Sequence, residues 1–295
     1  MGGVFKHAGG LPINCIAKWD GTSWSAVGSG IEGLSVNAIA INGTDVYAGG
    51  AFNYAGGIHA NCIAKWDGSS WSSLDGGVSS VVPYVKAITV NETDVYVGGS
   101  FTSAGDVAAR NIARWNSITN TWCSLGSGVN GEVSTIAVSG TEVYVGGDFS
   151  EAGGLPARFL ARWDGSAWSA VGSGIGIGNP VMGVVMALAL SGSVLYVGGN
   201  LIPYQMPGDF LAVWNGTSWS SLLEGVDDTV HAIKVSGGDL YVAGRFGQAG
   251  SGEAKHIARW DGRQWTALGE GTSDIVYAVA LSSATSDVYV GGAFT

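Results

Sequence analysis

The chain has 295 residues and a formal net charge of -10, and only 12% of its residues are charged, while Gly reaches 50 and Trp 12. An acidic chain of this kind is repelled by nucleic-acid phosphates and by anionic lipid, so we expect neither partner. It contains no run of about 18 apolar residues, which excludes a predicted membrane-spanning helix. Abundant Gly beside many aromatic and β-branched residues predicts short strands joined by tight turns.

Taken in chain order, one motif recurs about every 48 residues, the period typical of propeller blades. It reads "IAKWDGTSW" at Ile16–Trp24 and "IAKWDGSSW" at Ile63–Trp71. The first Trp of each copy and then the second Trp of each copy account for all the Trp residues: Trp19, Trp66, Trp115, Trp163, Trp214 and Trp260, then Trp24, Trp71, Trp122, Trp168, Trp219 and Trp265. We expect these Trp to be structural residues of the repeat.

Four strand-like runs can be recognised in each repeat, here named A to D. Between residues 134 and 172 they are "STIAV", "EVYVGGDF", "FLARWD" and "SAWSAVG". Each run alternates or is rich in β-forming residues, and each is bounded by turn residues. Runs of this length with hairpin turns predict an antiparallel meander. The expected fold is therefore all-β, a six-bladed β-propeller with four antiparallel strands in each blade.

The two ends of the sequence carry a further copy of one piece of the repeat. The chain opens with "GGVF" at Gly2–Phe5 and closes with "GGAFT" at Gly291–Thr295. The first repeat has strands C and D, and the last has A and B. We expect a single domain over residues 1–295, in which residues 1–30 and 275–295 form one composite blade that closes the ring. A cut through a longer array of repeats would leave the same overlap, and this alternative stays open.

The repeat resembles known propeller families. A Gly-Gly doublet ending strand B, an aromatic residue on C and a Trp on D resemble the kelch repeat, with "NSITNTW" at Asn116–Trp122 as the most similar stretch. The whole unit is similar to the WDG and VYVGG repeats of large bacterial surface or secreted proteins. These resemblances imply a propeller and no catalytic residues, because the families share a fold and not a chemistry. We expect an extracellular or cell-surface location, and a cytosolic protein is the alternative.

A binding surface is expected where the repeats differ. The connections between strands D and A and between B and C share one face of a meandering blade, and here they are long and dissimilar, which is typical of a binding surface. The first position of strand A also varies, and neighbouring loops add Tyr residues. The candidate ligand-binding residues are Asn37, Lys86, Ser134, Met186, His231 and Tyr277, with Tyr54, Tyr84 and Tyr204. Simple variation among exposed loops is the alternative.

The chemistry-bearing residues form no enzyme signature. There is no G-x-S-x-G, H-E-x-x-H or P-loop motif, and none of the four His recurs at a fixed position of the repeat. We expect no catalytic residues, no cofactor and no metal site, although the acids of the turns leave calcium as an alternative. A column of cations lies at Lys18, Lys65, Arg114, Arg162 and Arg259, and two positions after each of them lies Asp20, Asp67, Asn116, Asp164 or Asp261. We expect repeated charged pairs or turn contacts between these residues, and a ring that binds an anion is the alternative.

Our leading functional hypothesis is a non-catalytic binding or scaffold propeller, monomeric, whose variable face takes a protein or glycan ligand. The alternative is a carbohydrate-binding propeller, because "WDGTSW" is similar to a run in six-bladed fucose-binding lectins. That alternative requires exposed Trp faces. A hydrolase or lyase with a single site near His231 is a third hypothesis.

Overall fold

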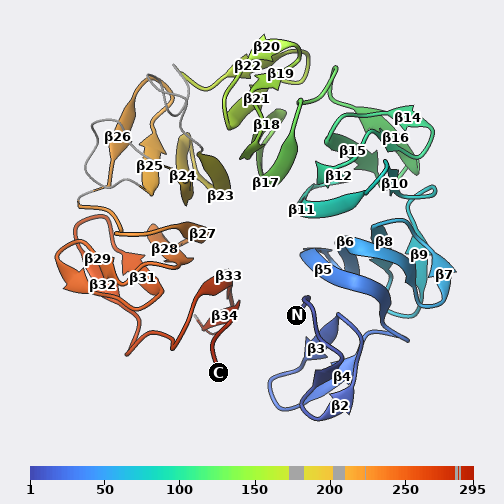
Figure 1. The fold of residues 1–295 in the computed structure, drawn as a ribbon, viewed down its shortest axis with the longest axis horizontal. Coiled ribbons are helices and arrows are strands. Elements are labelled where there is room, and N and C mark those ends of the chain that lie inside the picture. Colours follow the sequence, from blue (N-terminus) through green and yellow to red (C-terminus); the bar gives the residue numbers. More distant parts are fainter. Residues whose placement is uncertain (173–182, 202–209, 223, 283–284, 286) are drawn as a thin grey trace. The chain divides into compact units, whose positions relative to one another are not determined.

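The fold is described from a computed structural model that places residues 1–172, 183–201, 210–222, 224–282, 285 and 287–295 (Figure 1). Within these ranges every regular element is a β-strand and no helix occurs. The strand pairs of the described residues are antiparallel, as between strands A and B of four of the sheets. The all-β prediction is confirmed.

The main sheets each contain four strands in chain order, with a small hairpin often inserted between the second and third strand. They are β5(Ile31–Asn42)-β6(Asp45–Ala55)-β8(Ile63–Trp66)-β9(Trp71–Ser73), β11(Tyr84–Asn91)-β12(Asp94–Ser100)-β15(Ile112–Asn116)-β16(Thr121–Ser124), β17(Glu132–Ser139)-β18(Glu142–Asp148)-β21(Leu160–Trp163)-β22(Trp168–Ala170), β23(Val184–Ser191)-β24(Val194–Asn200)-β25(Leu211–Trp214)-β26(Trp219–Ser221) and β27(Val230–Ser236)-β28(Asp239–Gly244)-β31(Ile257–Trp260)-β32(Trp265–Ala267). These strands are the predicted A, B, C and D of each repeat.

The first and last repeats supply two-stranded sheets, β3(Ala17–Trp19)-β4(Trp24–Ala26) and β33(Val276–Leu281)-β34(Val288–Gly292). Strands β3 and β4 correspond to C and D, and β33 and β34 to A and B. The two sheets are separate in the recorded strand order, so the predicted composite blade stays a prediction.

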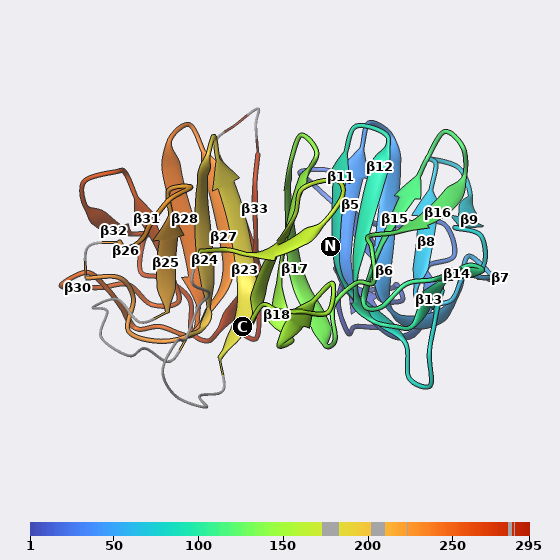
Figure 2. The same ribbon diagram turned by 90° about the horizontal axis from the view of Figure 1, so that it is seen from above.

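Short hairpins occupy the B–C connections, an addition that the sequence did not predict because each strand has only two residues. They are β1(His7–Ala8)-β2(Leu11–Pro12), β7(Ile58–His59) paired with β6, β13(Ser103–Ala104)-β14(Val107–Ala108), β19(Glu151–Ala152)-β20(Leu155–Pro156) and β29(Gln248–Ala249)-β30(Gly252–Glu253). Strand β10(Val78–Ser79), which lies in a D–A connection, pairs with β13. Figure 2 shows β13 and β14 at one end of β12 and β15.

The chain divides into two compact units. The first contains Met1–Val143, Phe149–Pro156 and Trp163–Ser169, and the second contains Tyr144–Asp148, Ala157–Arg162 and Ala170–Thr295. In each unit the core lies between consecutive sheets. One cluster joins Ile63 of β8 with Val85 and Val97 of the next sheet, and a second joins Leu211 of β25 with Val230 of the next sheet. The single-domain prediction for residues 1–295 stays a prediction.

The Trp pairs connect neighbouring sheets. The two Trp of each repeat face each other across strands C and D, with ring centroids 5.2 to 5.6 Å apart. In three repeats the second Trp also reaches the preceding sheet through its ring N–H. Trp71 Nε1 donates to the Val27 carbonyl at 3.0 Å, Trp122 Nε1 to the Leu74 carbonyl at 2.8 Å and Trp168 Nε1 to the Leu125 carbonyl at 2.6 Å. Such an acceptor satisfies a buried Trp N–H, whereas the equivalent Trp219 Nε1 is buried without one in the ranges that the structure describes.

Asparagine side chains make a second set of contacts between sheets. Asn42 Nδ2 donates to the Glu92 carbonyl at 2.8 Å, and Asn91 Nδ2 donates to the Gly140 carbonyl at 2.9 Å. Both residues end a strand A, so these two A–B turns are each tied to the A–B turn of the following sheet.

Candidate functional site

The predicted variable positions at the start of strand A coincide with β-bulges. Pairing between strands A and B skips one residue at this point in β5, β11, β23, β27 and β33. The skipped residues are Asn37, Lys86, Met186, His231 and Tyr277. A bulged residue lies outside the ladder, and bulges often re-aim a side chain beside a functional site. Periodicity in the sequence does not reveal the extra residue.

The Gly-Gly doublet of strand B is explained by two close approaches. The second Gly lies against the bulged backbone, so a Cβ on Gly99 would overlap the Tyr84 carbonyl oxygen, and a Cβ on Gly50 would overlap that of Ser35. The first Gly lies under the next strand A, where a Cβ on Gly98 would be 3.0 Å from Val133 Cβ and 3.1 Å from Ile136 Cδ1. The doublet therefore positions both the bulge and the neighbouring sheet.

Three of the predicted site residues meet around one carboxylate, Glu132. Tyr84 and Lys86, from β11, both donate hydrogen bonds to Glu132 of β17, and Lys86 forms an ion pair with it. Ser134 Oγ donates to Glu132 Oε1 at 3.0 Å, and Ser134 is buried. We call Tyr84, Lys86, Glu132 and Ser134 the polar cluster. All four residues lie in the first unit.

The residues of the polar cluster shift one another's pKa values. Burial by itself raises the pKa of Glu132, but the hydrogen bonds from Lys86 and Tyr84 outweigh it and hold the pKa below its ordinary value. Burial and then the hydrogen bond to the Glu132 carboxylate raise the pKa of Tyr84 to about 12. The cluster therefore holds an ionised carboxylate, an ammonium and a neutral phenol. These groups can bind polar ligand atoms.

Sequence reasoning missed Glu132. The residue lies two positions before Ser134, in the same repeat column as Tyr84, which is two positions before Lys86. That column varies as strongly as the one that was selected, with Ser35, Tyr84, Glu132, Val184, Thr229 and Ile275. Variation in two neighbouring columns was the signal that could have identified it.

The remaining candidates lie in smaller groups. Asn37 is exposed, and its Nδ2 donates to the Val85 carbonyl of the next strand A at 3.0 Å. His231 and Tyr277, in the second unit, pack edge to face with centroids 5.1 Å apart. Met186 is half-buried on β23. Tyr54 is exposed and packs against His59 of the β7 hairpin. Tyr204 lies outside the described residues.

The cation column forms ion pairs with the A–B turns. Lys65 Nζ lies 2.6 Å from Asp45 Oδ2, Arg114 lies 3.3 Å from Asp94, and Arg259 lies 2.7 Å from Asp239. These three turn acids are therefore engaged by cations of the adjacent strand.

The acids of the C–D turns have a different role. Asp67 Oδ1 accepts the backbone N–H groups of Ser69 and Ser70, each at 2.8 Å. Hydrogen bonds of this kind close an Asx turn, which explains the repeated "WDG". Among the described residues, no three His, Cys, Asp or Glu side chains gather in a way that could hold a metal ion.

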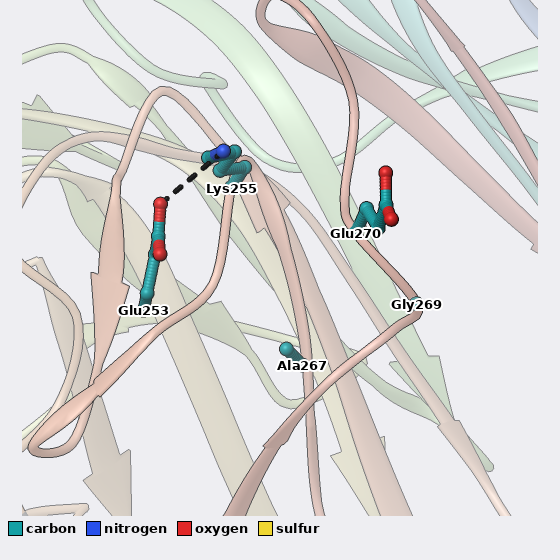
Figure 3. A pocket seen from close by; sticks show the side chains of 5 residues that line it. All are labelled: Glu253, Lys255, Ala267, Gly269 and Glu270. Carbon is teal, nitrogen blue, oxygen red and sulfur yellow. Dashed lines mark ion pairs between the residues drawn. The ribbon is translucent and has the colours of Figure 1, made fainter.

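A shallow hollow lies in the second unit and is lined by Glu253, Lys255, Ala267, Gly269 and Glu270 (Figure 3). Lys255 Nζ lies 3.3 Å from Glu253 Oε1, and both side chains are largely exposed. Its volume of about 190 Å³ is below that of typical small-molecule sites. The described part of the chain also has no helix long and apolar enough to span a membrane.

Comparison with known proteins identifies relatives in fold only. No family model matches the chain, and no curated protein matches it. Among solved structures, the crystal structure of the computationally designed Ika8 protein aligns with a TM-score of 0.56 and 17% identity, covering 86% of this chain and 67% of that one. The computationally designed Ika4 protein aligns with a TM-score of 0.39 and 15% identity, covering 62% of this chain and 94% of that one. The first likeness concerns the all-β fold alone.

Proposed function

We propose that this chain is a non-catalytic binding or scaffold propeller, extracellular or on a cell surface, which acts as a monomer and presents its variable face to a protein ligand. The observation that carries the proposal is the set of β-bulges at the variable positions. The scaffold repeats its glycines, Trp pairs and turn acids, whereas the bulged side chains and their neighbours differ. A rigid framework that varies at one end of its strands is the usual arrangement of a binding surface.

The polar cluster is the proposed centre of this surface. Its charges are held in place before binding, which lowers the entropy that a ligand must overcome. Lys86 has an exposed fraction of 42% for its side chain, so its ammonium can be shared with a ligand carboxylate or carbonyl while Glu132 anchors it.

A comparison of variants in a proteome-wide binding array tests this proposal. A partner that binds the parent should lose at least about tenfold in affinity with Lys86→Glu, since like charges placed against one another cost several kcal/mol at an interface. The matched control is Lys6→Glu, which makes the same charge change at an exposed residue outside the cluster. Partners whose binding is equally weakened by both variants, or by neither, would count against the polar cluster.

A carbohydrate-binding propeller is the second candidate, because one Trp face is available while the edge of β3 is not covered by the ring closure proposed below. Trp19 is 41% exposed, and its ring lies 5.2 Å from that of Trp24. Exposed aromatic faces stack on sugars. A glycan array with Trp fluorescence as the titration, on the parent and on Trp19→Ala, tests this function. Saturable binding that Trp19→Ala abolishes would support it, and a blank array would leave the scaffold function alone.

We also propose that β33–β34 and β3–β4 complete one another as strands A, B, C and D of a sixth blade, which closes the ring of a kelch-like propeller. Contacts that are present in other repeats and incomplete at the two ends support this. Lys18 lacks the turn acid that Lys65 has in Asp45, and Asp287 holds the corresponding position in the last repeat. A Cβ on Gly269 meets nothing within 4 Å, whereas Gly28 and Gly172 lie against the Trp pair of the following sheet.

A designed disulfide tests this closure. Tyr47 pairs with Lys65 and Tyr241 with Arg259, so the same register pairs Tyr289 with Lys18. Lys18→Cys with Tyr289→Cys should form an intramolecular disulfide under mild oxidation, because paired residues lie within disulfide reach. Peptide mapping distinguishes this bond from bonds that involve the native Cys15, Cys62 and Cys123. If positions 18 and 289 are linked only between molecules, or not at all, the ring is not closed.

A further inference from the structure

The first five residues fill the place of a strand B beside β3. Gly2 forms an antiparallel bridge with Ile16, Gly3 N donates to the Cys15 carbonyl at 3.0 Å, and Cys15 N donates to the Phe5 carbonyl at 2.9 Å. The next sheet has the same bonds. Gly50 N donates to the Cys62 carbonyl at 2.9 Å, and Cys62 N donates to the Phe52 carbonyl at 2.8 Å. Residues 1–5 therefore occupy the position that residues 48–52 hold in β6.

The packing of residues 1–5 against the following sheet matches as well. A Cβ on Gly2 would lie 2.5 Å from Val36 Cγ1 and 3.0 Å from Ile39 Cδ1. A Cβ on Gly49 of β6 would overlap Val85 Cγ1 and lie 2.8 Å from Ile88 Cδ1, in the same two columns of the repeat. The N-terminal segment thus has the strand C contacts and the next-sheet contacts of a complete strand B.

The C-terminal copy has the complementary contacts. Strand β34 pairs with β33, its strand A, over Val288–Gly292. A Cβ on Gly292 would overlap the Ile275 carbonyl oxygen, as one on Gly50 would overlap that of Ser35. A Cβ on Gly291, however, meets nothing within 4 Å. In β6 a single segment makes all of these contacts, whereas here the two copies of the motif divide them.

We infer that residues 1–5 and residues 290–294 are alternative occupants of one strand position at the edge of β3. This inference rests on the ring closure proposed above. The register of β6 and β8 pairs Ala48 with Ala64 and Gly49 with Ile63, so β34 would set Val290 opposite Ala17 and Gly291 opposite Ile16. Ala17 N already donates to the Met1 carbonyl at 2.9 Å, and Ile16 is already paired with Gly2. One strand edge pairs with one strand, so full closure releases residues 1–5.

The two occupants differ in what favours them. Residues 1–5 are close to β3 along the chain, so their pairing closes a short loop and loses little chain entropy. Strand β34 has two residues that residues 1–5 have no counterpart for, Val288 and Tyr289, and these would add pairs with Trp19 and Lys18. Pairing of β34 with β3 would also place β33 in the same sheet, because β33 is paired with β34. Tyr277 of β33 is exposed. The segment of residues 1–5 thus acts as a built-in competitor of ring closure.

Valine substitutions in the two copies separate the occupants. Gly2→Val disrupts only the N-terminal occupant, because its side chain must overlap Val36. Gly291→Val causes no overlap in the present position of β34, where a Cβ on Gly291 meets nothing within 4 Å. Once β34 pairs with β3, the valine side chain must overlap Val36, as that of Gly2→Val does. The readout uses chains that carry Ala17→Cys and Val290→Cys. Peptide mapping measures the fraction of chains in which positions 17 and 290 are joined by a disulfide at equilibrium in a glutathione buffer.

We expect Gly2→Val to raise the ratio of linked to unlinked chain by roughly tenfold and Gly291→Val to lower it by a similar factor, as overpacking of this kind commonly does. A chain without residues 1–5 should behave like Gly2→Val, which covers the case of a folding defect from the substitution. Equal linked fractions in all of these chains would overturn the competition while leaving ring closure intact. A disulfide between positions 18 and 289 without any between positions 17 and 290 would do the same. The loss of both disulfides would overturn closure and competition together.

Discussion

Two copies of one motif in the first unit differ sharply in burial. In β15 and β16, Trp115 is 4% exposed and Trp122 is 5% exposed, whereas Trp19 of β3 is 41% exposed, although both pairs face each other with centroids 5.2 Å apart. The difference comes from the preceding sheet, since Trp122 donates to the Leu74 carbonyl of that sheet. The strand that carries a Trp pair does not bury it. Each Trp pair is buried by the sheet before it, so the stability of a sheet depends on its interface with its neighbour, as in other repeat proteins.

The largest expected effect lies at the buried pair. Trp122→Ala should lower the free energy of unfolding by about 3–5 kcal/mol, because it leaves a cavity and the Leu74 carbonyl without its donor. Urea unfolding followed by circular dichroism measures this loss. The comparison is Trp19→Ala, at the first Trp of the exposed pair, in a chain kept open by Gly291→Val, and it should cost less than about 1 kcal/mol. Similar losses at the two sites would contradict the role of the preceding sheet.

An intermediate effect is expected where sheets approach most closely. Gly98→Val should cost about 1–3 kcal/mol, since the added side chain must displace Val133 and Ile136 of the next sheet. Gly252→Val is the control, because its Cβ would meet only the Ala249 carbonyl, at 3.8 Å. Thermal unfolding of both variants gives the comparison. A tolerated Gly98→Val would mean that the sheets can separate without cost.

A smaller effect is expected at the turns that join the sheets. Asn91→Ala should cost about 1 kcal/mol, the usual net value of one hydrogen bond, because the Gly140 carbonyl loses the Asn91 amide. Asn53→Ala, at an exposed position of β6, should be neutral within about 0.5 kcal/mol. Urea midpoints at equal slope measure both changes. An equal response at the two sites would assign no stabilising role to the turn contact.

The smallest effect concerns pH. The folded-state pKa of Glu132 lies below its ordinary value of 4.5, so its ionisation stabilises the fold above about pH 4.5, and this contribution is lost as pH falls through the folded-state pKa. Glu132→Gln should therefore flatten the decline of stability between neutral and acid pH. Glu253→Gln, at an exposed acid outside the polar cluster, is the control variant. Melting temperatures across this pH range provide the measurement, and a parallel decline in Glu132→Gln and the parent would contradict the pairing.

The sequence predicted the strands because their signals are local. "VYVGG" and "IARW" alternate and end in turn residues, and β12, β15, β18 and β31 lie where these runs predict. The Trp pairs across C and D also follow from spacing. The bulges were missed, since one extra residue before Ala87 or Ala232 leaves the alternation on either side unchanged. The two-residue hairpins were missed because they are too short to show a pattern.

Contacts between repeats were harder to predict than contacts within one. Tyr84 and Lys86 were selected for their variability, but their partner Glu132 belongs to the next repeat, and no local pattern joins them. The cation column forms charged pairs, but the partner of Lys65 is Asp45 of the neighbouring strand and not Asp67, the acid two positions on. Pairings of this kind depend on strand register, which sequence spacing alone leaves undetermined.

The bulges have a consequence for how such a surface can diversify. At Lys86 or His231 the residue is supernumerary to the hydrogen-bonded ladder, so a mutation there changes the chemistry of the surface without altering any strand pair. The glycine opposite each bulge cannot be replaced in the same way, because a Cβ there would overlap the carbonyl oxygen of the bulged strand. Randomised libraries confined to the bulged codons would therefore sample new recognition properties on a scaffold whose folding is left almost untouched, a separation that antibody frameworks achieve with far longer loops.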